Sequence, residues 1–168
     1  MYFSFHRDSN RALPKRSTVD DETFISTNVE GIRGVAEATR NFSGGKFIML
    51  SSGCAFKQNT GGIITVDSER ETGNTFSRSK NLAEAVVANI FAGEESRLAI
   101  VYPPIILHES QRQGIIPYAL QDVKSSGVIT NKVPDGHINF VTHDKLAELI
   151  DAIARDNSSR DIQRYPIT

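Results

Sequence analysis

The chain has 168 residues, and 19 Lys and Arg against 20 Asp and Glu give it a formal net charge of -1. The length predicts one domain, and the chain has no basic excess that would indicate a nucleic-acid partner. No apolar run reaches the roughly 20 residues of a membrane-spanning helix, and the N-terminus does not read as a secretory signal. With a single cysteine, Cys54, these features predict a cytoplasmic protein without a nucleic-acid or membrane partner.

The first part of the chain predicts a strand, a helix and a buried strand. Residues 1–5 read as a strand, and a polar loop follows them. Apolar residues at helical spacing predict a helix over about 21–39, with acidic residues at its start. Gly44 and Gly45 are expected to end this helix. The apolar run 46–52 predicts a strand that is covered on both faces.

The middle of the chain repeats the order of helix and strand. A polar connection over residues 53–75 comes first, and loops of this length inside a domain are often functional. A helix with an apolar stripe from Leu82 to Phe91 follows. Residues 97–102 predict a second buried strand, and Pro103 and Pro104 stop it.

The last part of the chain predicts a short helix over 114–126, a strand over 137–142 and an amphipathic helix over 143–156. The residues after Asn157 are polar, and we expect them to fray. The sequence therefore predicts one domain over residues 1–156 and a C-terminal tail over 157–168.

Strands that alternate with helices predict an α/β fold with about three parallel strands and crossover helices. Ligands of such sheets bind beyond the carboxyl ends of the strands. Ser51 and Ser52 follow the first buried strand, and Lys80 lies on the next helix. A tyrosine four residues before a lysine shares its helix face, and the cation lowers the tyrosine pKa from about 10. Phe76, which has no hydroxyl, holds that position here.

Five segments occur in one order: TNVEGIRGVAEATRN, KFIMLSSGCAF, FSRSKNLAEAVV, RLAIVYPPIIL and HINFVTHDKLAELIDAI. In this order they resemble the extended short-chain dehydrogenase/reductase superfamily, of the nucleotide-sugar epimerase/dehydratase and 3β-hydroxysteroid dehydrogenase type. The resemblance covers about residues 20–155 and implies a Rossmann-like sheet that binds NAD or NADP. The family's glycine-rich turn, which holds the pyrophosphate, has no counterpart here. We therefore expect an incomplete sheet that lacks the first βαβαβ half.

The resemblance also implies roles for individual residues. Ser52 would face the substrate, Lys80 would hold the nicotinamide ribose, and Asn28 would support a proton relay. Phe76 stands at the position of the catalytic tyrosine. Without the phosphate-binding half, cofactor binding is expected to be weak or lost. The cofactor-binding residues implied by the resemblance are Ser51, Lys80, Tyr102 and Pro103.

Each of these residues also has a purely structural interpretation. Ser51 and Ser52 are also typical of a turn whose side chains hydrogen-bond to their own backbone. Lys80 is also typical of a solvent-exposed lysine on a helix. Cys54 has no positioned base in the sequence. His143 beside Asp144 indicates a dyad or a helix cap. The three histidines of the second half of the chain lack metal-ligand spacing with any acidic or cysteine partner, so no metal site is predicted; they are His108, His137 and His143.

Three functional hypotheses remain open at this point. The first is an epimerase, dehydratase or reductase with lost or weak redox activity, acting on a small carbonyl, alcohol or nucleotide-sugar substrate. The second is a non-catalytic binding or regulatory module. The third is a half-enzyme that needs a separate dinucleotide-binding chain. An incomplete sheet exposes a strand edge and an apolar face, so we expect an oligomer, a protein partner that covers the sheet, or poor solubility.

Overall fold

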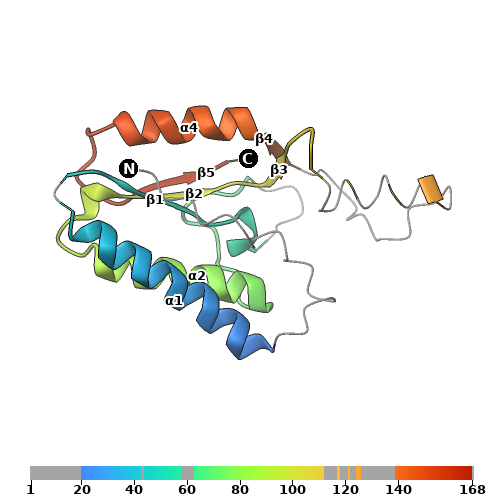
Figure 1. The fold of residues 1–168 in the computed structure, drawn as a ribbon, viewed down its shortest axis with the longest axis horizontal. Helices are drawn as coiled ribbons and strands as arrows, with labels where there is room; N and C mark the ends of the chain where they lie inside the picture. Colours follow the sequence, from blue (N-terminus) through green and yellow to red (C-terminus); the bar gives the residue numbers. More distant parts are fainter. Residues whose placement is uncertain are drawn as a thin grey trace.

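The structure is a computed structural model that describes residues 20–42, 44–57, 63–111, 117, 121, 124–125 and 139–167. A parallel sheet lies between two helices on one face and one helix on the other (Figure 1). This arrangement confirms the predicted α/β fold. The helices are α1 (Asp21–Arg40), α2 (Thr75–Ile90) and α4 (His143–Arg155), with short 3-10 turns η2 (Gly53–Ala55) and η3 (Glu95–Arg97). The strands are β1 (Phe47–Leu50), β2 (Leu98–Tyr102), β3 (Ile105–Leu107), β4 (Phe140–Thr142) and β5 (Gln163–Pro166).

Side-chain caps define where the two paired helices begin. The Asp20 carboxylate accepts a 2.9 Å hydrogen bond from the backbone N–H of Thr23, and this bond lowers the Asp20 pKa. The Asn74 side chain caps α2 in the same way. The glycines do not end α1, because its last residue is Arg40. Gly44 and Gly45 instead take positive φ angles of 74° and 121° and turn the chain toward β1.

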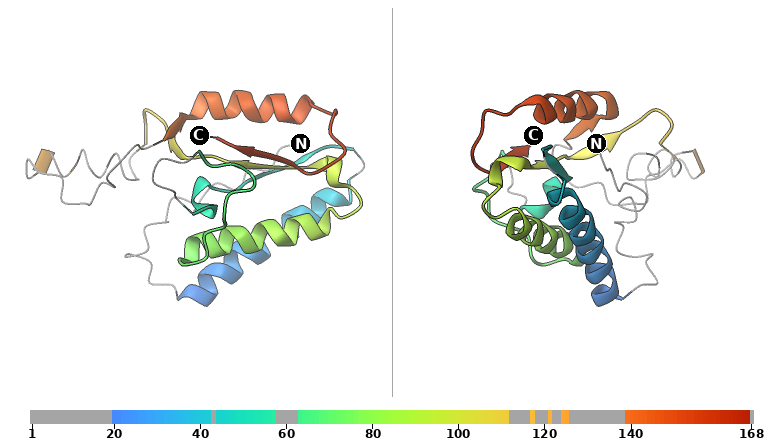
Figure 2. Two further views of the ribbon diagram at one scale, coloured as in Figure 1. Left: turned by 180° about the vertical axis from the view of Figure 1, so that it is seen from behind. Right: turned by 60° about the vertical axis from the view of Figure 1, so that its left-hand side comes forward.

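The main sheet has the order β1-β2-β5, and all of its strands run parallel. β2 is buried along its whole length because it lies between the other two strands and under helices on both faces. Alternate residues of β2 serve different layers. Ile100 and Tyr102 pack toward α1 and α2, whereas Ala99 and Val101 pack toward α4. The two views in Figure 2 show α1 beside α2 and α4 across the sheet from them.

The expectation that the tail frays is wrong for β5, which pairs in parallel with β2. The cause is a polar cluster at its first residue. Lys46 Nζ donates a 2.6 Å hydrogen bond to the side chain of Gln163 and a second bond to the carbonyl of Asp156. Gln163 donates in turn to the Asp156 carboxylate at 2.7 Å. Hydrogen bonds from Ser158, and then from Gln163, lower the pKa of this carboxyl to about 2. Polar side chains therefore hold a strand in a segment whose composition predicts a frayed end.

The strand predicted over 137–142 is present as β4, but it pairs with β3 in a separate two-stranded parallel sheet. The proline pair does end β2, and β3 begins directly after it, which the sequence did not predict. The strand predicted over 1–5 lies outside the described residues, as does most of the helix predicted over 114–126. Among the described residues, no helix is long and apolar enough to cross a membrane.

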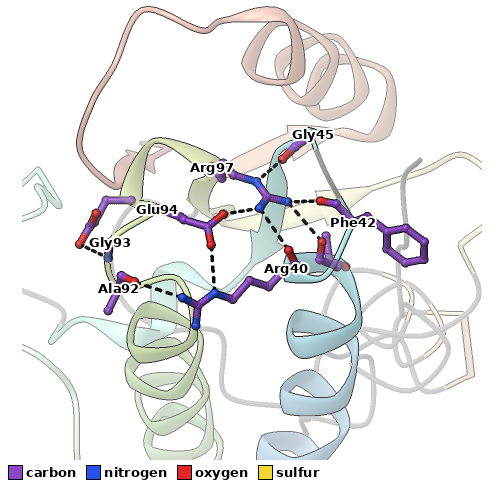
Figure 3. A network of polar contacts seen from close by, with 9 residues as sticks. Arg40, Phe42, Gly45, Ala92, Gly93, Glu94 and Arg97 are labelled. Carbon is purple, nitrogen blue, oxygen red and sulfur yellow. Dashed lines mark hydrogen bonds and ion pairs between the residues drawn. The ribbon is translucent and has the colours of Figure 1, made fainter.

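Arg97 connects the end of α1 to the turn before β2 (Figure 3). Its guanidinium donates to the carbonyl oxygens of Phe42 at 2.8 Å and of Gly45 at 3.0 Å. It also donates to the carbonyls of Thr39 and Arg40 and pairs with the Glu94 carboxylate. The last carbonyls of a helix have no partner inside it, so one side chain satisfies the C-terminal end of α1.

Candidate functional site

The carboxyl ends of β1 and β2 meet at one edge of the sheet, as the sequence predicts. Ser51 N–H donates to the Val101 carbonyl at 2.8 Å, and Gly53 N–H donates to the Pro103 carbonyl at 2.9 Å. These bonds continue the parallel pairing beyond both strands. They place the Ser51–Ser52 segment beside Pro103, in the region where parallel sheets bind ligands.

The two serines of this edge differ in their hydrogen bonding. Ser52 Oγ accepts a 3.2 Å hydrogen bond from the Cys54 N–H and caps η2, which is the turn that bonds its own backbone. Ser51 is only 6% exposed, and its Oγ has no hydrogen-bond partner among the described residues. A buried hydroxyl without a partner costs free energy. Ser51 is therefore the unsatisfied polar group of this edge.

Phe76 and Lys80 lie together near the start of α2, where Asn74 Oδ1 caps the helix through a 2.8 Å bond from Ser77 N–H. Lys80 Nζ lies 5.6 Å from the centroid of the Phe76 ring. Burial lowers the Lys80 pKa. Within the described part of the chain, this amine has neither a hydrogen bond nor an ion pair. Lys80 is thus half-buried against an aromatic ring and is not the solvated lysine of the structural interpretation.

Asn28 connects α1 to the same turn of α2. Its Nδ2 donates a 3.3 Å hydrogen bond to Ser79 Oγ. Ser79 is fully buried and donates to the carbonyl of Phe76 at 2.8 Å. The structure therefore links Asn28 to the backbone of the residue at the tyrosine position.

The turn η2 is tied to α2 by two further bonds. Ser77 Oγ donates to the Cys54 carbonyl at 2.6 Å, and Asn81 Nδ2 donates to the Ala55 carbonyl at 3.1 Å. The Ser51–Ser52 segment and the helix α2, which carries Phe76 and Lys80, are consequently held together as one unit. This unit places the sequence-predicted residues Ser51, Ser52 and Lys80 on neighbouring elements.

Tyr102 lies in the core and not at the open edge. Its hydroxyl donates a 2.7 Å hydrogen bond to Glu84 Oε1, and burial raises its pKa to about 12. Arg70 binds the same carboxylate through two nitrogens, at 2.8 and 3.0 Å. Its guanidinium also lies 4.3 Å from the centroid of the Phe56 ring. The proposed contact of Tyr102 with a nicotinamide stays a prediction.

Sequence reasoning missed this buried group of Glu84, Arg70 and Tyr102. The sequence contains one indication of Glu84, because this residue lies four positions after Lys80 and therefore on the same face of the helix. Arg70 offered none, since it lies at the end of a long polar loop. That loop folds back so that Lys57 N–H donates to the Glu69 carbonyl at 2.8 Å, and Glu71 N–H donates to the Ala55 carbonyl at 2.9 Å.

The other candidate residues form no site in the described part of the chain. The cap of α4 is Thr142, and His143 Nδ1 lies 3.5 Å from the Asp144 carboxylate with both side chains exposed. Cys54 is an exposed free thiol. The described residues contain no group of three or more His, Cys, Asp or Glu side chains placed to hold a metal.

Comparison with known proteins decides the family. A family model described as Male sterility protein matches residues 16–150, which is most of the chain. The chain belongs to the Male sterility protein family. This NAD-binding family confirms the resemblance to the extended short-chain dehydrogenase/reductase superfamily. A search of curated proteins found no match.

Solved structures similar to this Male sterility family chain share its fold at low sequence identity. WbmG from Bordetella bronchiseptica, in complex with NAD and UDP, matches with a TM-score of 0.72 and 16% identity over 91% of this chain and 47% of that chain. RMD from Pseudomonas aeruginosa, complexed with NADPH, has a TM-score of 0.63 and 21% identity over 88% and 53%, respectively.

A tyrosine-to-phenylalanine mutant of UDP-glucuronic acid 4-epimerase from Bacillus cereus is also similar. Its structure contains NAD and UDP-4-deoxy-4-fluoro-glucuronic acid, and it matches with a TM-score of 0.68 and 12% identity over 85% of this chain and 46% of that chain. This Male sterility family chain thus spans about half the length of the solved chains it matches, and these chains bind NAD or NADPH.

Proposed function

We propose that this chain is an NAD(P)-binding member of the epimerase, dehydratase and reductase group whose own redox activity is lost or weak. The observation that carries the proposal is the pairing of Phe76 with Lys80. The amine lies beside a ring that has no hydroxyl to pass a proton. In this proposal, Phe76 stands where the catalytic acid would lie beside Lys80, and the acid itself is replaced.

In this proposal the residues at the sheet edge contact the nicotinamide end of the cofactor. Lys80, which has no partner among the described residues, would bond the ribose hydroxyls. Ser51 Oγ, which is buried and unsatisfied, would gain its missing partner from a bound cofactor. Ser52 would face the substrate, and Asn28 would hold the first turn of α2 through Ser79. The nicotinamide, when bound, would supply the hydride chemistry.

The substrate class is a small carbonyl or alcohol compound or a nucleotide-sugar. Support for the nucleotide-sugar comes from the solved neighbours, two of which hold UDP or a UDP-sugar beside NAD. The Bacillus cereus mutant also holds NAD although it carries a phenylalanine in place of a tyrosine. Binding without turnover is therefore the expected behaviour of this chain.

The test is calorimetric titration of NAD⁺, NADH, NADP⁺ and NADPH into the purified protein. We expect binding of at least one dinucleotide with a Kd below about 100 μM, on the order of -5.5 kcal/mol. Lys80→Ala should weaken it. Lys145→Ala is the matched control, because Lys145 is exposed on α4 and forms an ion pair with the surface residue Glu148. No heat with any of the four would overturn the proposal and favour a non-catalytic binding module.

A half-enzyme is a second candidate, and the edge of the sheet favours it. Within the described residues, β1 pairs with β2 alone, and a strand from a second chain would extend the sheet at the other side of β1. Co-expression with a chain that supplies a glycine-rich strand-turn-helix unit tests this candidate. If this chain is a half-enzyme, the two chains should purify together, and tight dinucleotide binding should be seen only in the complex.

A further inference from the structure

A cavity of about 170 Å³, open to solvent, lies between α2 and β5. None of the residues assigned above to the cofactor or the substrate lines this cavity. Its lining residues are Arg70, Asn81, Glu84, Ala85, Ala88 and Arg164. Two arginines thus face one cavity in which Glu84 is the single acidic residue among the described lining.

The charges in this cavity do not cancel. Glu84 is 8% exposed at its side chain, and its carboxylate accepts from Arg70, from Tyr102 and, at 3.4 Å, from Arg164 Nε. One carboxylate against two guanidinium groups leaves a formal charge of +1. Both arginine side chains are 32% exposed, so the excess positive charge can attract an anion from the solvent.

The two arginines differ in how much of their bonding capacity is used. Arg70 binds Glu84 in a fork with both terminal nitrogens, and one of them also reaches Asn81 Oδ1 at 3.4 Å. Arg164 makes one long bond through Nε. Its two terminal nitrogens have no partner in the described part of the chain, although the side chain is only 32% exposed. Arg164 therefore has hydrogen-bond donors that remain available to a ligand in the cavity.

Strand pairing fixes where this donor lies. Arg164 of β5 is the register partner of Ile100 in β2, which packs toward α1 and α2. Residues that are opposite one another on neighbouring strands lie on the same face of the sheet. Arg164 is consequently held over α2, against a helix surface of two alanines that leaves room beside the guanidinium.

We propose that this cavity is a binding site for a phosphate group, with Arg164 as its bidentate donor and Arg70 as a second source of positive charge. Guanidinium forks match phosphate oxygens in geometry and form strong charge-assisted bonds with them. A volume of about 170 Å³ holds several waters at about 30 Å³ each, and so accommodates one such group. The group is either free inorganic phosphate or the phosphate of an organic ester.

The experiment titrates inorganic phosphate and, separately, uridine monophosphate into the whole chain at constant ionic strength, with chloride as the balancing ion. Thermal unfolding and calorimetry report binding. We expect saturable binding of at least one probe and a higher unfolding midpoint. Arg164→Gln should weaken the affinity by about tenfold or more, because it removes a charged donor. The affinity of Arg164→Lys should lie between those of the parent chain and Arg164→Gln, since lysine keeps the charge but lacks the forked donor geometry of arginine.

Arg160→Gln is the matched control, because it removes the same charge from an exposed residue four positions earlier in the chain. Ester binding at least as tight as that of inorganic phosphate would identify an ester as the source, and binding of the inorganic ion alone would identify the free ion. The proposal is overturned if neither probe binds, or if Arg164→Gln binds as well as the parent chain. Dinucleotide binding in Arg164→Gln should be unchanged, which separates this site from the proposed cofactor site.

Discussion

The hydroxyl of Tyr102 donates a 2.7 Å hydrogen bond to Glu84 inside the core, where Arg70 completes the pairing of the carboxylate. Tyr102→Phe keeps the ring, which packs edge-on against Phe56 with centroids 4.8 Å apart. It removes one donor from a buried charged acceptor. We expect a loss of about 1–2 kcal/mol in the free energy of unfolding, measured by urea denaturation. An unchanged midpoint would show that the hydroxyl contributes nothing to stability.

The same residue predicts a loss of stability at alkaline pH. Its pKa rises from 10.0 to about 12 on folding, chiefly through burial. In the unfolded chain the phenol loses its proton near pH 10, whereas the folded chain keeps it until about pH 12. The stabilisation is therefore fully present below pH 10 and falls as pH rises through this window, by up to about 3 kcal/mol. Urea denaturation at several pH values should show this fall in the parent chain relative to Tyr102→Phe, and parallel curves would contradict it.

Two buried serines should respond to alanine in opposite directions. Ser51→Ala removes a hydroxyl that has no partner among the described residues, so stability should rise by about 1 kcal/mol. Ser77→Ala removes a 2.6 Å bond to the Cys54 carbonyl, so stability should fall by about 1 kcal/mol. Chemical denaturation measures both. If Ser51 holds the cofactor, its alanine variant should also bind dinucleotide more weakly, and stabilisation without weaker binding would refute that role.

Phe76→Tyr places a phenol within reach of an amine that has no partner in the described part of the chain. Because the Phe76 ring is only half-buried, the Lys80 cation should outweigh burial and hold the new tyrosine pKa below its usual 10. Ultraviolet difference titration of the variant against the parent chain measures this value. Adding Lys80→Ala should move the value back up, and a pKa above 10 with Lys80 intact would contradict the prediction.

Arg97→Gln should destabilise the fold by about 2 kcal/mol, because several backbone carbonyls at the end of α1 lose their donor. Arg33→Gln is the control. Arg33 also lies in an ion pair, with Glu30, but this pair is on the exposed face of α1, and such pairs contribute about 0–1 kcal/mol. Equal losses in the two variants, measured by thermal unfolding, would show that the network adds nothing beyond a surface pair.

The sequence predicts those elements whose stability comes from apolar residues at a regular period. The helix expected over about 21–39 and the strand expected over 97–102 agree within a few residues with α1 and β2. β5 could not be predicted in this way, since Gln163 and Arg164 are polar and are held by Lys46, Asp156 and Glu84. Those partners are 7 to 117 residues away along the chain.

The residues of the candidate site also fall into a group that the sequence predicts and a group that it does not. Ser51, Ser52 and Lys80 follow from the strand order and from the spacing within one helix. The link from Asn28 to Ser79 depends on how α1 packs against α2, and the role of Arg70 depends on the fold of a loop. Hydropathy carries no information about either contact, because both join polar side chains across segments that are distant in sequence.

The pairing of β2 with β5 has a consequence for how the chain folds. Ala99 and its partner Gln163 are separated by 64 positions in the sequence, and Phe47 and its partner Leu98 by 51. Contacts this distant slow folding, because the intervening segment must lose entropy before they form. The last strand completes the coordination of Glu84 through Arg164, so that carboxylate obtains its second guanidinium only when the most distant pairing of the sheet has formed.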